Sequence, residues 1–184
     1  MAISHSCFVF VIFTAFLLYA VKGCDPPYCD NVDCGSCGNA CCNLMFMIPD
    51  STSHDVAEAL NSTLKGGGPG GLYEARPLQQ GATGVVSIKN HAGPVEFIGQ
   101  AFHTSRIEQY VDTIDFTIES DPGNYVAGEW EYDTVLKASS ISQVGGAYCD
   151  EGQNYNNIMT LVTALGFDFK VKHTDDSCPP PPPI

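Results

Sequence analysis

The sequence is poor in basic residues and in recognisable catalytic motifs. Eight lysines and arginines stand against 21 acidic residues in a chain of 184, which gives a formal net charge of −13. Nucleic acids and anionic membranes bind basic surfaces, so this balance argues against both as partners. The Gly-x-Ser-x-Gly elbow, the His-Glu-x-x-His motif and the phosphate-binding loop are also missing. We therefore predict no catalytic residue, metal site or cofactor, and an enzyme of unrecognised type ranks last among the functions considered.

A long hydrophobic run is missing as well. The longest, Phe8–Ala20, has 13 residues, whereas a helix needs about 20 to span a bilayer. It begins close to the N-terminus and leads to the small residues Ala20 and Gly23, which suit a cleavage site. We interpret residues 1–23 as a signal peptide, which predicts a secreted, extracellular protein without a stable membrane anchor.

Cysteine, in contrast, is abundant. Cleavage after Gly23 removes Cys7 and Lys22, leaving eight cysteines and a charge of −14, from 7 basic and 21 acidic residues. An even number of cysteines in a secreted chain predicts a disulfide framework, although the pairing stays open. A zinc site through Cys34 and Cys37 is the alternative, which the secretory context disfavours. The predicted disulfide cysteines are Cys24, Cys29, Cys34, Cys37, Cys41, Cys42, Cys149 and Cys178.

Residues 24–42 hold six of these cysteines and form a Cys-rich disulfide segment. Residues 43–173 then predict one α+β domain, an antiparallel sheet of about five or six strands flanked by an N-terminal and a C-terminal helix. Residues 174–184 form a proline-rich tail that is extended, either as a stiff end or as a ligand for an aromatic groove. The predicted strands are Leu44–Ile48, Val85–Lys89, Val95–Phe102, Tyr110–Glu119, Glu129–Ser140 and Phe167–Lys172.

Helical spacing marks two segments. Val56, Ala57, Leu60 and Leu64 recur on one helical face between the start signal Pro49-Asp50-Ser51 and Gly66. The second helix is predicted over Tyr155–Leu165, with Asn154 as its N-cap and Gly166 as its stop.

Strand periodicity is clearest in Tyr110–Glu119. There Asp112, Ile114, Phe116 and Ile118 alternate with the other residues and should form the core face, with Asp112 at its edge. In Glu129–Ser140, the consecutive apolar pair Val135-Leu136 indicates either a bulge or a strand covered on both faces.

The motif Ser140-x-Ser142-x-Val144-Gly145, followed by Asp150-x-Gly152-x-Asn154, resembles the signature of domain-of-unknown-function family number 1499. The stretch Val111–Glu119 resembles the acidic, apolar strand before that signature, and the resemblance extends over Asn43–Leu165. Gln143 and Tyr155 stand where the family has arginines, and two extra residues, including Cys149, precede Asp150. The resemblance implies a fold, and it implies no activity because the family has none established.

Few side chains suggest a binding site. Asp150, Glu151 and Asn154 carry the oxygen ligands that Ca²⁺ prefers, but a loop-and-cap role is the favoured interpretation. The acidic residues Asp112, Asp115, Glu129, Glu131 and Asp133 should carry diffuse, solvated charge on the sheet.

The histidines that remain after processing, His54, His91, His103 and His173, are expected at the surface or in turns. Asn61-Ser62-Thr63 is a glycosylation sequon on the first helix, and we predict a glycan on Asn61 if its side chain faces solvent.

These observations favour a binding or structural role outside the cell. The alternative is a carrier of a small apolar ligand, in a pocket between the sheet and the C-terminal helix. The expected partner is thus an extracellular protein, a glycan or a small apolar ligand. The pocket would be lined by Phe97, Phe102, Phe116, Ile118, Trp130 and Leu161.

Overall fold

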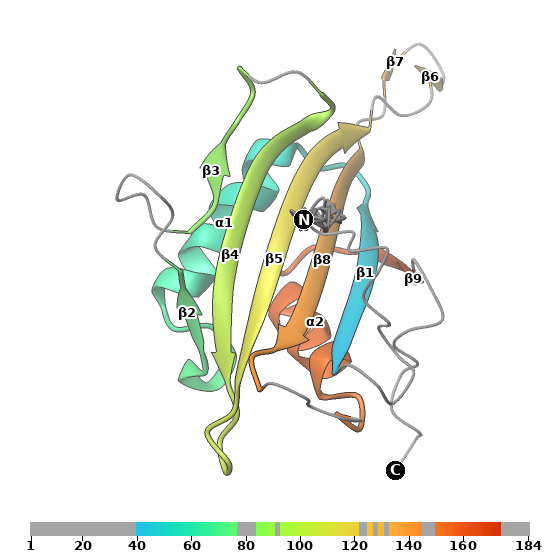
Figure 1. The fold of residues 1–184 in the computed structure, drawn as a ribbon. Coiled ribbons are helices and arrows are strands. Elements are labelled where there is room, and N and C mark those ends of the chain that lie inside the picture. The colour runs from blue at the N-terminus through green and yellow to red at the C-terminus, as the bar shows by residue number, and fades with distance from the viewer. Residues whose placement is uncertain are drawn as a thin grey trace, which may run out of the picture.

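The computed structural model describes residues 40–76, 84–90, 93–121, 125–126, 129–130, 133–144 and 150–173. Within these residues the chain forms a seven-stranded antiparallel sheet with two helices, which confirms the predicted α+β class (Figure 1). The main elements are β1 (Cys41–Ile48), α1 (Ser53–Lys65), β2 (Tyr73–Ala75), β3 (Val86–Ser87), β4 (Val95–Thr104), β5 (Val111–Asp121), β8 (Asp133–Ser142), α2 (Gln153–Thr163) and β9 (Lys170–His173). A 3₁₀ turn, η1, covers Pro69–Gly71.

The strand order is β2-β4-β5-β8-β1-β9, with β3 also pairing with β4. The β4–β5–β8 meander follows the chain as predicted. The first strand, β1, however, lies between β8 and β9, so that Cys41 and Cys42 are part of the sheet. The last strand is at the sheet edge, as expected from its lysines, and is shorter than predicted.

The predicted strand Glu129–Ser140 is divided in two. β7 (Glu129–Trp130) pairs with β6 (Tyr125–Val126) in a separate ribbon, whereas β8 pairs with β5 and β1. The pairing of Val135 and Leu136 with both neighbours is uninterrupted, and both side chains are buried. Of the two interpretations of this apolar pair, the structure supports burial on both faces rather than a bulge.

Both helices lie on the same face of the sheet (Figure 1). This helix-covered face carries Ile114, Phe116 and Ile118, each at most 1% exposed, and Asp112 at its end, which confirms the predicted core face of β5. The largest buried side chains are Leu44, Phe46, Ile48, Val56, Leu60, Ile114, Phe116, Ile118, Leu136, Ile158, Leu161 and Val162.

The predicted first helix is confirmed. Thr52 is its N-cap, and its hydroxyl accepts from the Asp55 backbone N–H at 3.2 Å. The helix ends at Gly66, and the apolar stripe of α1 is buried against the sheet.

The predicted start of the second helix is wrong by two residues. Gly152 occupies the N-cap position of α2 and Asn154 lies inside the first turn, fully buried. The cap is instead the carboxylate of Asp150, which accepts from the backbone N–H groups of Gly152 at 3.1 Å and Asn154 at 2.7 Å. Asp and Asn cap equally well, so composition alone did not distinguish them.

Several predicted features lie outside the described residues. They are the signal peptide, the Cys-rich segment before residue 40, the turn at 122–124, His91, Glu131, Gly145-Gly146, Cys149, Cys178 and the proline tail, together with the side chains of Glu129 and Trp130.

Candidate functional site

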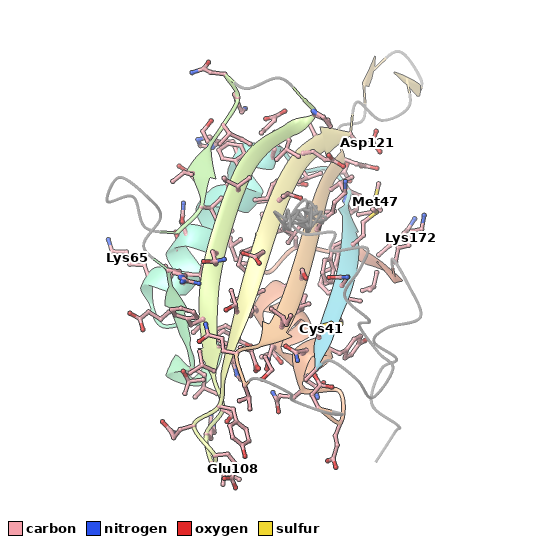
Figure 2. The ribbon with its side chains drawn as sticks, viewed as in Figure 1. Cys41, Met47, Lys65, Glu108, Asp121 and Lys172 are labelled. Carbon is pink, nitrogen blue, oxygen red and sulfur yellow. The ribbon has the colours of Figure 1, made fainter. Side chains whose placement is uncertain are left out.

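Figure 2 shows that side chains project from the strands of the sheet along their length. By the strand registers, two sets of polar side chains lie on opposite faces of the sheet. The His103 cluster consists of Tyr73, His103, Asp112, Gln153 and Asn157, on the helix-covered face. Its first three members lie directly opposite one another on β2, β4 and β5. Its last two come from α2. The cluster therefore joins three strands to one helix.

Hydrogen bonds to Asn157 hold the cluster together. The Asn157 amide donates to Asp112 Oδ2 at 2.7 Å and its oxygen accepts from Gln153 Nε2 at 2.6 Å. The Tyr73 hydroxyl donates to the Asn157 backbone carbonyl at 2.8 Å. Burial raises the pKa of Tyr73 to about 12, while a hydrogen bond with Thr160 opposes the shift, so this hydroxyl keeps its proton at neutral pH.

His103 is buried, not at the surface or in a turn as predicted. It is 4% exposed, and its ring lies 4.9 Å from that of Tyr73. Its Nδ1 is 3.5 Å from Asp112 Oδ2, within ion-pair range, but makes no hydrogen bond with the described residues. The physical reason is strand alternation: on β4, His103 shares the inward face with Phe97 and Ala101.

The other described histidines differ from His103. His54 is exposed on α1, 3.8 Å from Glu58, as predicted for a surface residue. His173 ends β9, the edge strand.

An aspartate beside a histidine is a common arrangement in general-base catalysis. Here, however, both residues are only 4% exposed and the aspartate oxygen already accepts a hydrogen bond from Asn157. The described contacts support a structural role for the His103 cluster, which fastens α2 to β4 and β5.

Asp150 and Asn154 meet at the start of α2. Asn154 Nδ2 donates to Asp150 Oδ2 at 2.7 Å, and the Ser140 hydroxyl donates to Asn154 Oδ1. Three residues of the family-like motif thus form one capped turn. Glu151 is exposed beside it, with φ of 53°. Among the residues that the structure describes, no group of three or more His, Cys, Asp or Glu side chains is placed to hold a metal ion.

The second set, the polar row, crosses the opposite face of the sheet. Gln100, Asp115, Ser139 and Asn43 are direct cross-strand partners on β4, β5, β8 and β1. Neither described helix covers this face (Figure 1). Ser139 and Asn43 are buried, whereas Gln100 and Asp115 are partly exposed. The accessible end of the row is therefore the β4–β5 end.

Asp115 is the electrostatically unusual member of the row. Burial raises its pKa, and the hydrogen bond from Gln100 Nε2 and the positive charge of Arg76 lower it only in part. The expectation that Asp112 carries solvated charge is wrong, because Asp112 is buried, on the face opposite to Asp115.

Charged groups near the polar row are balanced by partners. Lys137 Nζ lies 2.8 Å from Glu119 Oε1. The Arg76 guanidinium lies 4.7 Å above the Phe102 ring. The Gln143 amide donates to the Thr113 hydroxyl at 2.8 Å, so Gln143 contacts the sheet here.

The predicted apolar pocket is not assembled as expected. Phe97, Phe116, Ile118 and Leu161 belong to one packed core cluster. Phe102 alternates to the opposite face, where it contacts Arg76. The described members of the set therefore do not line one cavity.

Alternation predicted the core face of β5, and the same rule applied to β4 would have separated His103 from Gln100. Which residues of β4 face Asp112 and Asp115 depends on the register of the β4–β5 hairpin, which local patterns did not specify.

No family model matches this chain, and no curated protein matches it either. The resemblance to family number 1499 stays a prediction. Within the described residues, no helix is both long and apolar enough to cross a membrane.

Proposed function

We propose that this chain is a secreted, disulfide-stabilised α+β domain that acts outside the cell by binding a partner through the polar row. The N-terminal apolar run Phe8–Ala20 and the even number of remaining cysteines support secretion. Of those cysteines, Cys41 and Cys42 lie in the described residues, on β1.

The observation that carries the binding role is Asp115. Its carboxyl group is partly buried on the face that neither helix covers, and burial raises its pKa. An ionised carboxylate that loses hydration on folding lowers the stability of the folded state. The stability of the fold therefore does not explain why a carboxylate stands at position 115. Such perturbed groups are common in binding sites.

The chemistry of the polar row favours a partner with hydrogen-bond donors. The accessible carboxylate of Asp115 accepts hydrogen bonds, and the amide of Gln100 both donates and accepts. Glycan hydroxyls or polar groups of an extracellular protein suit this pair better than a small apolar ligand does. The carrier alternative has less support, because the residues proposed for its pocket do not converge.

Secretion is tested by mass spectrometry of the protein isolated from culture medium, intact and after reduction. We expect a mature chain that begins at Cys24 and gains the mass of eight hydrogens on reduction. Free thiols in a chain that keeps residues 1–23 would contradict secretion.

Binding is tested on arrays of glycans and extracellular proteins, with the wild type and the variants Asp115→Asn and Gln100→Ala. Glu58→Gln, on the exposed side of α1, is the matched control. We expect each row variant to lose at least about tenfold in affinity and the control to bind as the wild type does. Row variants that bind like the wild type would refute the proposed site.

A further inference from the structure

Asn61 is held in a contact that its glycosylation would break. Its side chain lies on α1, 24 positions before Val85, which directly precedes β3. Asn61 Oδ1 accepts from the Val85 backbone N–H at 2.6 Å, and Asn61 Nδ2 donates to the Val85 carbonyl at 2.9 Å. The side-chain amide thus pairs with Val85 as a neighbouring strand would.

Two glycines make room for this pairing. Gly84 has φ of +81°, and a Cβ there would lie 2.2 Å from Asn61 Oδ1. On β4, a Cβ at Gly99 would lie 2.7 Å from Val85 Cγ2. Val85 itself is only 6% exposed. We name Asn61, Gly84, Val85 and Gly99 the Val85 clamp, because together they fix the start of β3 between α1 and β4.

The geometry of amides decides what a glycan does to this clamp. A primary amide that binds the N–H and C=O of one residue at once uses the proton on the same side as its own oxygen. N-glycosylation makes the amide secondary, and the trans form of a secondary amide places the substituent on that same side. The sugar would therefore replace the proton that Asn61 donates to Val85.

We propose that glycosylation of Asn61 and formation of the Val85 clamp exclude each other, so that the folded secreted protein carries Asn61 unmodified. The proposal rests on the proposed secretion, since N-glycans are added to chains that enter the secretory pathway. It gives the sequon a structural role: its asparagine joins α1 to the edge of the sheet.

The test compares the full chain with two variants in a secreting eukaryotic host. Asp50→Asn creates an Asn-Ser-Thr sequence at 50–52, in an exposed turn where the backbone φ of 52° suits asparagine. Thr63→Ala removes the native sequon without changing Asn61. Intact mass before and after glycosidase treatment gives the occupancy, and hydrogen exchange gives the protection of the Val85 amide.

We expect no glycan on the wild type, one glycan on Asp50→Asn, and a Val85 amide as protected in the wild type as in Thr63→Ala. If part of the wild type carries a glycan at Asn61, its Val85 amide should exchange at least about a hundredfold faster than in Thr63→Ala. A glycan on Asn61 with Val85 still protected would overturn the proposal.

A second measurement separates this proposal from secretion itself. Asn61→Asp keeps the acceptor for the Val85 N–H but loses the donor, and should melt on the order of 5 °C below Thr63→Ala. Equal melting temperatures would show that the clamp contributes nothing and would refute the inference. If instead the Asp50→Asn variant carries no glycan, the proposed secretion is refuted. The melting temperatures of Asn61→Asp and Thr63→Ala still show whether the clamp stabilises the fold.

Discussion

Asp112 and Asp115 lie three residues apart on β5, on opposite faces of the sheet, and their surroundings differ. Asp112 is 4% exposed, next to His103, and accepts a hydrogen bond from Asn157 of α2. Asp115 is partly exposed on the face without a described helix, and burial raises its pKa. A buried carboxylate can therefore hold elements of the fold together where hydrogen-bond donors lie close to it, and it weakens the fold where such donors are too few.

Truncation of Asp112 is expected to have the largest effect on stability. Asp112→Ala leaves the Asn157 amide buried without its acceptor and removes the carboxylate that lies 3.5 Å from His103 Nδ1, so we expect a loss of about 3 kcal/mol in the free energy of unfolding. Urea denaturation measures the loss. The matched control is Asp115→Ala on the same strand, which should cost less than about 1 kcal/mol. Equal losses from the two alanine variants would show that the faces do not differ.

The cap at the start of α2 is expected to have an intermediate effect. Asp150→Ala removes the acceptor for the backbone N–H groups of Gly152 and Asn154, and should cost about 1–2 kcal/mol. Glu151→Ala, at the exposed neighbouring position, should change stability by less than about 0.5 kcal/mol. If the two variants unfold at the same urea concentration, Asp150 does not act as the cap.

Asp115→Asn should stabilise the protein, by about 0.5–1 kcal/mol at neutral pH. Since the folded pKa of Asp115 is raised, the folded state binds the proton more readily than the unfolded state. Wild-type stability is therefore lost as the pH rises through the folded pKa. The advantage of the variant should shrink as the pH falls toward the ordinary range of aspartate, as measured by thermal unfolding between acid and neutral pH. An advantage that grows on acidification would contradict the assignment.

Glu96 should show the opposite pH dependence, with the smallest effect. Burial raises its pKa, but the hydrogen bonds from Lys89, Ser53 and Ser120 and the charge of Lys89 outweigh burial and lower it overall. Its contribution is present above the ordinary pKa of glutamate and is lost as the pH falls through the folded value. Glu96→Gln should cost about 0.3–0.5 kcal/mol at neutral pH, with the difference vanishing in acid. A constant difference across this range would exclude the ionised pair as its cause.

The parts of the fold that depend on local periodicity could be predicted from the sequence. The helix with Val56, Leu60 and Leu64 and the inward face of β5 follow from periods of 3.6 and 2 residues. The position of β1 between β8 and β9 could not be predicted, because its partners, such as Ile141 for Cys41 and His173 for Leu44, come about a hundred positions or more later in the chain.

The candidate site was less predictable for the same reason. His103 meets Asp112 and Gln100 meets Asp115 only in the observed register of the β4–β5 hairpin, and a one-residue shift would exchange the faces. Asn61 pairs with a backbone segment that no side-chain pattern identifies. Asn154 was assigned the capping role of Asp150 because both residue types favour helix starts.

The most direct test of this account measures stability and binding of Asp115→Asn in the same preparation. The account predicts a protein that unfolds at higher temperature than the wild type at neutral pH and that binds its array partner at least about tenfold more weakly. A variant that is less stable, or one that binds as tightly as the wild type, would contradict the claim that Asp115 serves binding at the expense of the fold.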